Sequence, residues 1–182
     1  VSAPAGWAGK KVIAIAAGDE HSLALLDDGT VWGWGRGDIG QLGDGSGADS
    51  NVPVQAQALT GVTAIACGNL YSVAIGSGGT VWTWGDNTEG QLGRVTMLDD
   101  SSTPGQVAGI NGVTSIAAGV YHTITATSEG VVWAWGSNVN GQLGVGSSIT
   151  QSITPLVVAG LPVVVSVAAG GYHSVVAGSD GS

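Results

Sequence analysis

The sequence predicts an all-β fold built from repeated blades of four antiparallel strands, arranged as a β-propeller, and three observations predict it. First, a Trp-x-Trp-Gly segment followed by a Gly-Gln-Leu-Gly turn recurs, with Trp34, Trp84 and Trp135 spaced by 50 and 51 residues. Second, the segments between turn residues are short and rich in β-branched residues. Third, no segment combines helical periodicity with helix caps. A long fixed period indicates a repeat array, and radial repetition of four-stranded sheets is the propeller arrangement.

Each repeat divides into four expected strands. The first ends at a repeated glycine, the second begins at a His-Ser pair or a relative of it, and the third carries the tryptophans. The fourth is the looser segment after a repeated proline, and a leading piece at residues 2–9 aligns with it. In the first copy the strands fall at residues 11–18, 21–27, 30–35 and 53–59, and the prolines are Pro53, Pro104 and Pro155.

The second and third strands are expected to form a tight hairpin. Two-residue loops with glycine at the second position suit type I′ turns, in which both residues have positive φ. The sequence offers such a pair in every copy: Asp28-Gly29, Gly78-Gly79, Glu129-Gly130 and Asp180-Gly181.

The tryptophans are expected to pack one blade on the next. Residues i and i+2 of a strand share a face, so each pair projects from one side, and the residue between its members is small. This favours stacked sheets in which an indole pair meets a small-residue face of the neighbour. Alanines in the first strands suggest convergence near an axis. The pairs are Trp32 with Trp34, Trp82 with Trp84 and Trp133 with Trp135, and the alanines are Ala16, Ala66, Ala117 and Ala168.

The combined pattern of Gly-x-x-His-Ser, Asp-Gly-Thr-Val-Trp-x-Trp-Gly and Asn-x-x-Gly-Gln-Leu-Gly, at about fifty residues, resembles the regulator of chromosome condensation repeat. The resemblance covers nearly the whole chain and implies a propeller, typically of about seven blades. Residues 1–182 would then form a single partial propeller, about half a ring. Its repeats are expected at approximately 11–60, 61–111 and 112–162, with a partial one at 163–182. The chain would be a piece of a longer ring, a half-ring that pairs with a second copy, or an open array.

The composition bounds the partners. The formal net charge is −9, and the permanent cations are Lys10, Lys11, Arg36 and Arg94. Nucleic-acid binding depends on Lys and Arg that neutralise phosphates, and anionic membranes attract the same residues, so we expect neither partner. No apolar run is long enough for membrane insertion, and the N-terminus lacks a signal-peptide layout. Cys67 stands where other copies have alanine and is expected to be an apolar filler.

Two loop motifs are interpreted as structural. Arg36-Gly37-Asp38 resembles an integrin-binding triplet, but it occupies a turn position where Asp and Asn are favoured. The loop at residues 43–51 is acidic enough to suggest calcium, yet its spacing does not match an EF-hand, so a solvated loop is preferred.

The histidines are interpreted in the same way. His21, His122 and His173 share one repeat position, which Tyr71 fills in the remaining copy. Because successive blades hold such positions apart, we expect structural rings that bond nearby backbone, not a metal site. The sequence shows no catalytic set, so we expect no catalytic residues, no cofactor, no metal and no enzyme activity.

The variable loops between Gly-Gln-Leu-Gly and the next proline carry the functional expectation, because repeat proteins place specificity in loops on a rigid scaffold. We expect a non-catalytic protein-interaction scaffold. The alternatives are a structural subunit of an extracellular or surface assembly, such as a filament or sheath, and, from the resemblance, an exchange factor for a small GTPase. The expected partner-binding residues are Arg94, Met97, Leu98, Asp99 and Asp100.

The expected partners are another protein or further copies of the chain, as a homodimer or an open-ended assembly. Few Lys and Arg residues and an acidic composition suggest a bacterial or environmental protein, extracellular or at the cell surface, with a cytoplasmic location as the alternative.

Overall fold

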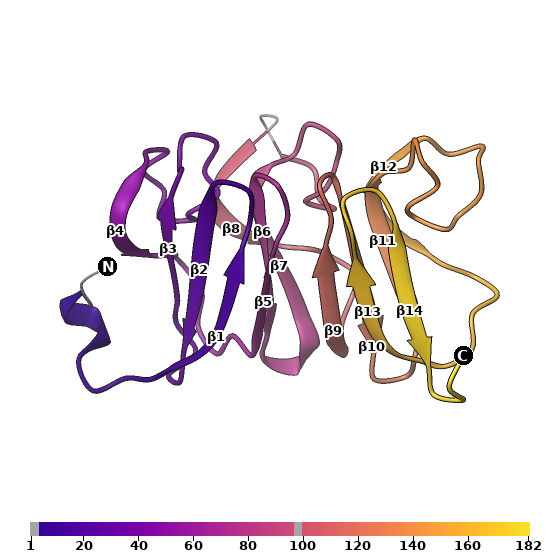
Figure 1. The fold of residues 1–182 in the computed structure, drawn as a ribbon, viewed down its shortest axis with the longest axis horizontal. Coiled ribbons are helices and arrows are strands. Elements are labelled where there is room, and N and C mark those ends of the chain that lie inside the picture. The colour runs from indigo at the N-terminus through magenta and orange to yellow at the C-terminus, as the bar shows by residue number, and fades with distance from the viewer. Residues whose placement is uncertain (1–3, 97–99) are drawn as a thin grey trace.

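The computed structural model describes residues 4–96 and 100–182, and within them the chain is β apart from two short 3-10 turns. Three sheets of four antiparallel strands and one of two strands follow one another. In Figure 1 they stand side by side, from the indigo N-terminal sheet to the yellow C-terminal hairpin. The predicted blades and the incomplete ring are confirmed.

Strands that are neighbours in the sequence are neighbours in each blade. The first blade holds β1 (Val12–Ala17), β2 (His21–Leu26), β3 (Val31–Gly35) and β4 (Ser50–Gln55), and the second holds β5 (Ala64–Cys67), β6 (Tyr71–Gly76), β7 (Thr80–Asp86) and β8 (Asp100–Gln106). The third holds β9 (Val113–Ala118), β10 (His122–Thr127), β11 (Val132–Ser137) and β12 (Gln151–Val157), and the fourth holds β13 (Val164–Ala169) and β14 (Ser174–Gly178). The 3-10 turns are η1 (Ala5–Trp7) and η2 (Ser77–Gly79).

In the three four-stranded blades, the fourth strand begins before its proline, so the prediction of a segment after the proline is wrong. Pro53 lies inside β4, Pro104 inside β8 and Pro155 inside β12. Each of these strands is outermost in its sheet and pairs on one side only. A residue without an N–H is tolerated at such an edge.

The described part of the leading piece, residues 4–9, does not form a strand. Its described residues make the 3-10 turn η1, and the Trp7 ring meets Trp32 edge to face, with 6.1 Å between ring centroids. No strand of the described residues pairs with this piece, and its Trp7 ring packs against the Trp32 indole instead.

The hairpin loops between second and third strands are not the predicted type I′ turns in three of the blades. Gly29 N–H bonds to Leu26 O, and Leu26 N–H bonds to Thr30 O, so the loop has three residues. Gly29 has a φ of 77°, whereas Asp28 is absent from the positive-φ residues. Such a three-residue loop, a type I turn followed by a left-handed glycine, is another common connection between two twisted antiparallel strands. In the second blade Gly78 and Gly79 both have positive φ.

The core of the molecule lies between the blades. Trp84 Nε1–H donates to the backbone oxygen of Gln41 in the first blade at 2.9 Å. Trp135 Nε1–H repeats the contact one blade later, donating to Gln91 O at 2.8 Å. Both indoles are fully buried, so the second and third blades are each joined to the preceding blade by an enclosed tryptophan.

The expected small-residue face opposite the indole is wrong. Trp84 packs in one cluster with Leu23 and Leu25 of the first blade, because branched aliphatic side chains fill the volume between sheets. The small residue that matters is Gly43, where a Cβ would stand 2.8 Å from Trp84 Nε1. Glycine there lets the indole N–H reach the neighbouring carbonyl.

The first strands of the blades converge, in agreement with their small residues. A hollow of about 240 Å³ is lined by Ala17, Cys67, Ala118 and Ala169 and the residues that follow them. Burial raises the pKa of the Cys67 thiol to about 12, so it is not a thiolate at neutral pH. Among the described residues, no helix has the length and apolar character needed to cross a membrane.

Candidate functional site

Arg94 opens the variable loop of the second blade, and its guanidinium is held in place by three hydrogen bonds. Nε donates to Thr83 Oγ1 at 3.2 Å, while Nη2 donates to Thr83 O and to Ser101 Oγ, both at 2.9 Å. The ladder between β7 and β8 is irregular between Thr83 and Gly85. The guanidinium therefore satisfies a carbonyl at a break in the sheet, and its position is fixed.

Arg94 has no carboxylate partner within residues 4–96 and 100–182. The ion pairs there join Lys10 to Asp28 and Arg36 to two carboxylates. Arg94 is half-buried, and this burial lowers the pKa of its guanidinium, which still stays charged because arginine does not deprotonate in proteins. A fixed positive charge to which no described residue supplies a counter-ion thus lies on the second blade.

Two hollows meet at Arg94, and both are also lined by Val95. The first, of about 450 Å³, is mostly apolar and includes Ile110, Trp133 and Pro155. The second, of about 390 Å³, is lined by hydroxyl groups and one carboxylate, from Ser101, Ser102, Thr103 and Asp100.

The predicted partner-binding residues are thus only partly located. Arg94 and Asp100 line the same hollow, and Asp100 begins β8. Met97, Leu98 and Asp99 lie outside the described residues. Sequence reasoning missed Trp133, which comes from the next blade, and Gly105, on which the Arg94 guanidinium lies. The signal for Gly105 was its departure from the repeat, where other copies have Val54 and Leu156.

The repeated histidines bridge blades. His21 Nε2 lies 2.9 Å from Ser72 Oγ, and Ser72 Oγ donates its proton to Gln41 O at 2.8 Å. The serine must therefore accept from the imidazole, which places the ring proton on Nε2. His122 makes the same bridge to Ser174, at 3.0 Å. The role of the serines was missed, although the repeated His-Ser pair was a usable signal.

Enclosure shapes the chemistry of these rings. Burial lowers the pKa of His21 and of His122 to about 4, and Nδ1 of both is buried without a partner among the described residues. Tyr71 fills the equivalent place by donating from its hydroxyl to His122 O at 2.5 Å. The described residues hold no group of three or more His, Cys, Asp or Glu side chains that could bind a metal ion.

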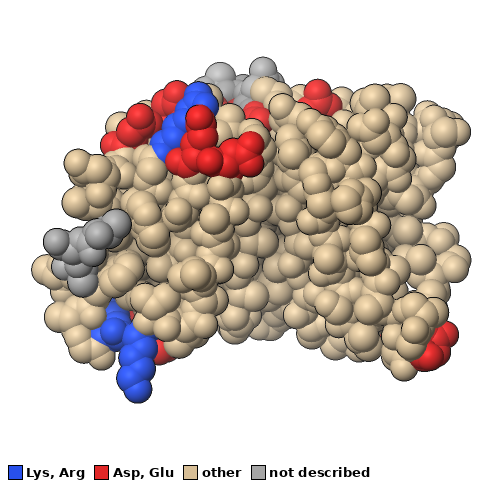
Figure 2. Space-filling view, in the orientation of Figure 1, with Lys and Arg blue, Asp and Glu red and all other residues tan. Residues whose placement is uncertain are grey.

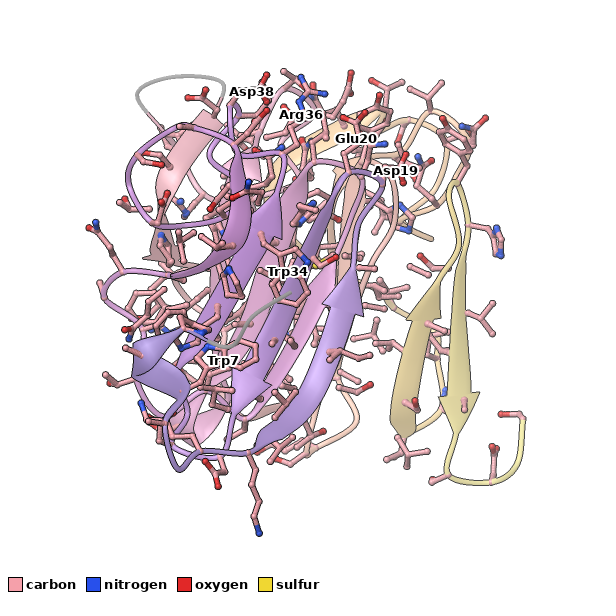
Figure 3. The ribbon with its side chains drawn as sticks, turned by 60° about the vertical axis from the view of Figure 1, so that its left-hand side comes forward. Trp7, Asp19, Glu20, Trp34, Arg36 and Asp38 are labelled. Atoms are coloured by element: carbon pink, nitrogen blue, oxygen red, sulfur yellow. The ribbon has the colours of Figure 1, made fainter. Side chains whose placement is uncertain are left out.

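The Arg36-Gly37-Asp38 triplet is neutralised within its own blade. Arg36 Nε and Nη2 donate to the two Asp38 carboxylate oxygens at 2.6 and 3.0 Å, and Nη1 donates to Glu20 at 2.6 Å. Figure 3 shows these side chains together at one end of the blade. Gly37 N–H donates to Asp49 at 2.9 Å. The arginine is engaged, and its acidic partners neutralise the charge that an integrin-type contact would use.

The acidic carboxylates of the loop at residues 43–51 serve local turns. Asp44 Oδ1 accepts from Ser46 N at 3.0 Å and from Ser46 Oγ at 2.8 Å, and Asp49 accepts from Gly37 as described. In the view of Figure 2, charged side chains gather toward the edges of the molecule and leave the middle of the face uncharged.

The two ends of the blade row expose sheet faces that are covered elsewhere. Figure 3 looks onto the first blade, where Trp34 lies on the open face. At the other end His173 is exposed, and Tyr172 and Val175 are 53% and 56% exposed. Between blades, the residues equivalent to Trp34, His173 and Val175 are enclosed, so both ends are apolar surfaces of the kind that a further blade would bury.

Residues 28–75, 78–126 and 129–177 match the regulator of chromosome condensation (RCC1) repeat, as do residues 12–41, 62–91 and 113–142 in a second description of that repeat. The chain is 38% identical over 178 residues to the ultraviolet-B receptor UVR8 of Arabidopsis thaliana, covering 94% of this chain and 40% of UVR8. It is 41% identical over 139 residues to the human E3 ubiquitin-protein ligase HERC2, covering 75% of this chain and 3% of HERC2.

Two crystal structures of yeast Prp20 have a similar fold. One shows Prp20 (yeast RCC1) bound to Kap60, with a TM-score of 0.83, 26% identity, and coverage of 95% of this chain and 43% of Prp20. The other, from work on binding to Gsp1p and histones, has a TM-score of 0.84, 25% identity, and coverage of 95% and 44%. This chain spans less than half the length of these relatives.

Proposed function

The chain belongs to the regulator of chromosome condensation repeat family, and from this membership we propose that it is a non-catalytic scaffold that binds protein partners through blade-edge loops. The observation that carries the proposal is the contrast within the second blade. Its framework repeats that of the other blades, whereas its variable loop presents a fixed Arg94, without an ion-pair partner among the described residues, beside an apolar hollow. Rigid presentation of a non-repeated group is typical of a recognition surface.

Relatives support a protein as the partner class. Prp20 is bound to Kap60 in one structure and was studied for its binding to Gsp1p and histones. The cations of this chain support the exclusion of nucleic acids, because Lys10 and Arg36 are already ion-paired and Arg94 is recessed. Few phosphate contacts are therefore left for a nucleic acid to make.

The test is capture of binding proteins by the immobilised chain, followed by comparison of variants. Arg94→Ala should lose a partner that the unchanged chain retains, and Asp44→Ala, at the equivalent position of the first blade, should keep it. Binding that ignores Arg94 and Asp100 would contradict recognition through this loop. Accelerated nucleotide release from a small GTPase would contradict the non-catalytic role and favour exchange activity.

A second candidate function, a structural subunit, is favoured by the open end faces. One end offers Trp34 and Ser22, and the other offers His173 and Val175, which are the two sides of an internal blade contact. Two different faces that fit each other form a head-to-tail contact, which gives a ring if the rotation closes and a filament if it does not. An extracellular or surface assembly is part of this candidate.

Light scattering after size exclusion tests the assembly. The unchanged chain should exceed its monomer mass of 17.8 kDa in a concentration-dependent way, and Trp34→Glu or Val175→Glu should restore the monomer. A discrete dimer would indicate two half-rings, and an open series would indicate a filament. If the unchanged chain stays monomeric at high concentration, the structural role is excluded.

A further inference from the structure

Arg94 and Gly105 form a pair that occurs only in the second of the three complete blades. The residue after Gly-Gln-Leu-Gly is Asp44 in the first blade and Val145 in the third. The residue after the repeated proline is Val54 in the first blade and Leu156 in the third. The second blade therefore combines a long cation with the loss of an aliphatic side chain on the neighbouring strand.

The two changes belong together in space. A Cβ built on Gly105 would stand 2.5 Å from Arg94 Cζ and 2.8 Å from its Nη1. The guanidinium thus occupies room that an aliphatic residue at position 105 would take. In the third blade the equivalent residue, Val145, packs against the apolar cluster that contains Leu143 and Val164. The second blade therefore has a cation where the third blade has an apolar contact.

No carboxylate of the described residues compensates the Arg94 charge. Its hydrogen bonds go to a carbonyl and two hydroxyl oxygens, all neutral, and Nη1 donates to no residue within the described ranges. A partly desolvated cation is stabilised most by a hydrogen-bonded anion. Nε and Nη2 already donate to protein oxygens, so the donors left for a ligand are the two N–H groups of Nη1. The site is therefore complementary to a carboxylate in charge and offers Nη1 as the hydrogen-bond donor.

The two hollows indicate which kind of ligand would supply that carboxylate. Both open at Arg94, the apolar one toward Trp133 and Pro155 and the hydroxyl-lined one toward Ser101. Ligand chain would continue on each side of the cation, which suits an internal side chain better than a chain terminus. Asp100 in the polar hollow and the net charge of −9 disfavour a run of acids.

We propose that Arg94 binds the carboxylate of a single Asp or Glu side chain in an extended segment of a partner protein, with the following apolar side chain in the Trp133 hollow. The inference rests on the proposed scaffold function and names the chemistry of its partner. The segment would read as a small polar residue, then an acid, then an apolar residue.

Capped pentapeptides test the proposal by NMR on the whole chain. The probe is acetyl-Gly-Ser-Glu-Leu-Gly-amide, and the matched control has Gln in place of Glu. The Glu peptide should shift the Arg94 Nε–H and Trp133 indole N–H resonances, assigned with Arg94→Lys and Trp133→Phe. The Gln peptide should bind about tenfold more weakly, since it loses a charged hydrogen bond.

The double variant Arg94→Val/Gly105→Leu installs the pair found in the third blade, so it should fold while losing the Glu peptide. Equal binding of the Glu and Gln peptides, or retained binding by the folded double variant, would overturn the proposal. So would preference for acetyl-Gly-Ser-Gly-Leu with a free carboxylate, which would assign the site to chain termini. If captured partners still depend on Asp100 when every peptide fails, the scaffold function stands and only this site is wrong.

Discussion

Trp84 and Trp34 occupy the same position of the repeat in different surroundings. Trp84 is fully buried and donates to Gln41 O, whereas Trp34 is half-buried on an open face and its indole donates to no described residue. At the other end, His122 is enclosed and His173 is exposed. The difference teaches that a motif residue stabilises this fold only where a second blade encloses it, as expected when repeats interact with nearest neighbours.

The largest expected effect is the loss of an enclosed indole. Trp84→Ala should lower the free energy of unfolding by about 3–5 kcal/mol, because it leaves a cavity and removes one of the two donors to Gln41 O, of which only Ser72 Oγ remains. Trp34→Ala should cost about 1 kcal/mol, because water already reaches the ring. Urea unfolding of the two variants measures the gap, and equal losses would contradict the role of enclosure.

The glycine three residues before the histidine gives a second test of how enclosure by a neighbouring blade affects a repeat position. A Cβ at Gly119 would overlap the His122 ring and stand 2.7 Å from the backbone oxygen of Gly170. Because that ring is enclosed and hydrogen-bonded, Gly119→Ala should cost about 1–3 kcal/mol.

The control is the equivalent glycine at the open end. The three atoms nearest to a Cβ at Gly170 all belong to the His173 ring, which is exposed and able to rotate away. Thermal unfolding should separate Gly119→Ala from Gly170→Ala by several degrees. Similar melting temperatures for the two variants would show that the enclosed His122 ring moves aside as easily as the exposed His173 ring.

Acid should weaken the enclosed bridges. His21 and His122 have a pKa of about 4 in the folded chain and about 6.5 when unfolded. The unfolded state therefore binds more protons between these values, so stability is present above pH 6.5 and falls as the pH drops toward 4. Between pH 6.5 and 5 the loss should be on the order of 1–2 kcal/mol for each imidazole.

Urea midpoints measured across that pH window test the histidines separately from most carboxylates, which titrate lower. His21→Gln and His122→Gln should each flatten the profile, at some cost in stability at neutral pH. His173→Gln should cost little stability at neutral pH, because no described blade encloses that ring. An unchanged slope in the His21 and His122 variants would show that other groups carry the acid response.

Much of the fold was predictable because the repeat fixes it. Alternation in Trp-x-Trp set the faces of the third strand, and Gly29 marked the hairpin. The turn type was not predictable from a dipeptide, since Asp28 keeps an ordinary φ and Gly29 alone takes the left-handed one. Leu23 and Leu25 as the surroundings of Trp84 depend on how sheets pack, which period alone does not specify.

The candidate site was less predictable because it crosses blades. Arg94 was identifiable as an unusual charge in a variable loop. Its contact with Gly105 depends on the pairing of β7 with β8, and the Trp133 wall comes from the third blade. Such contacts depend on strand register and on the order of the blades in the folded chain, which the sequence pattern alone does not specify. For the contact between Arg94 and Gly105, the departure of Gly105 from its repeat position was the signal in the sequence.

The smallest expected difference concerns the bridging hydroxyls. Ser72 accepts from His21 and donates to Gln41 O between the first two blades, while Ser22 holds the same repeat position on the open face. Ser72→Ala leaves a buried imidazole N–H without an acceptor and should cost about 1–2 kcal/mol. Ser22→Ala should stay within about 0.5 kcal/mol of the unchanged chain. A double-mutant cycle of Ser72→Ala with His21→Phe should recover part of the loss, because the phenyl ring has no proton to satisfy. If the two changes simply add, the bridge contributes nothing to the enclosed contact, and the indoles and aliphatic side chains alone distinguish it from the open face.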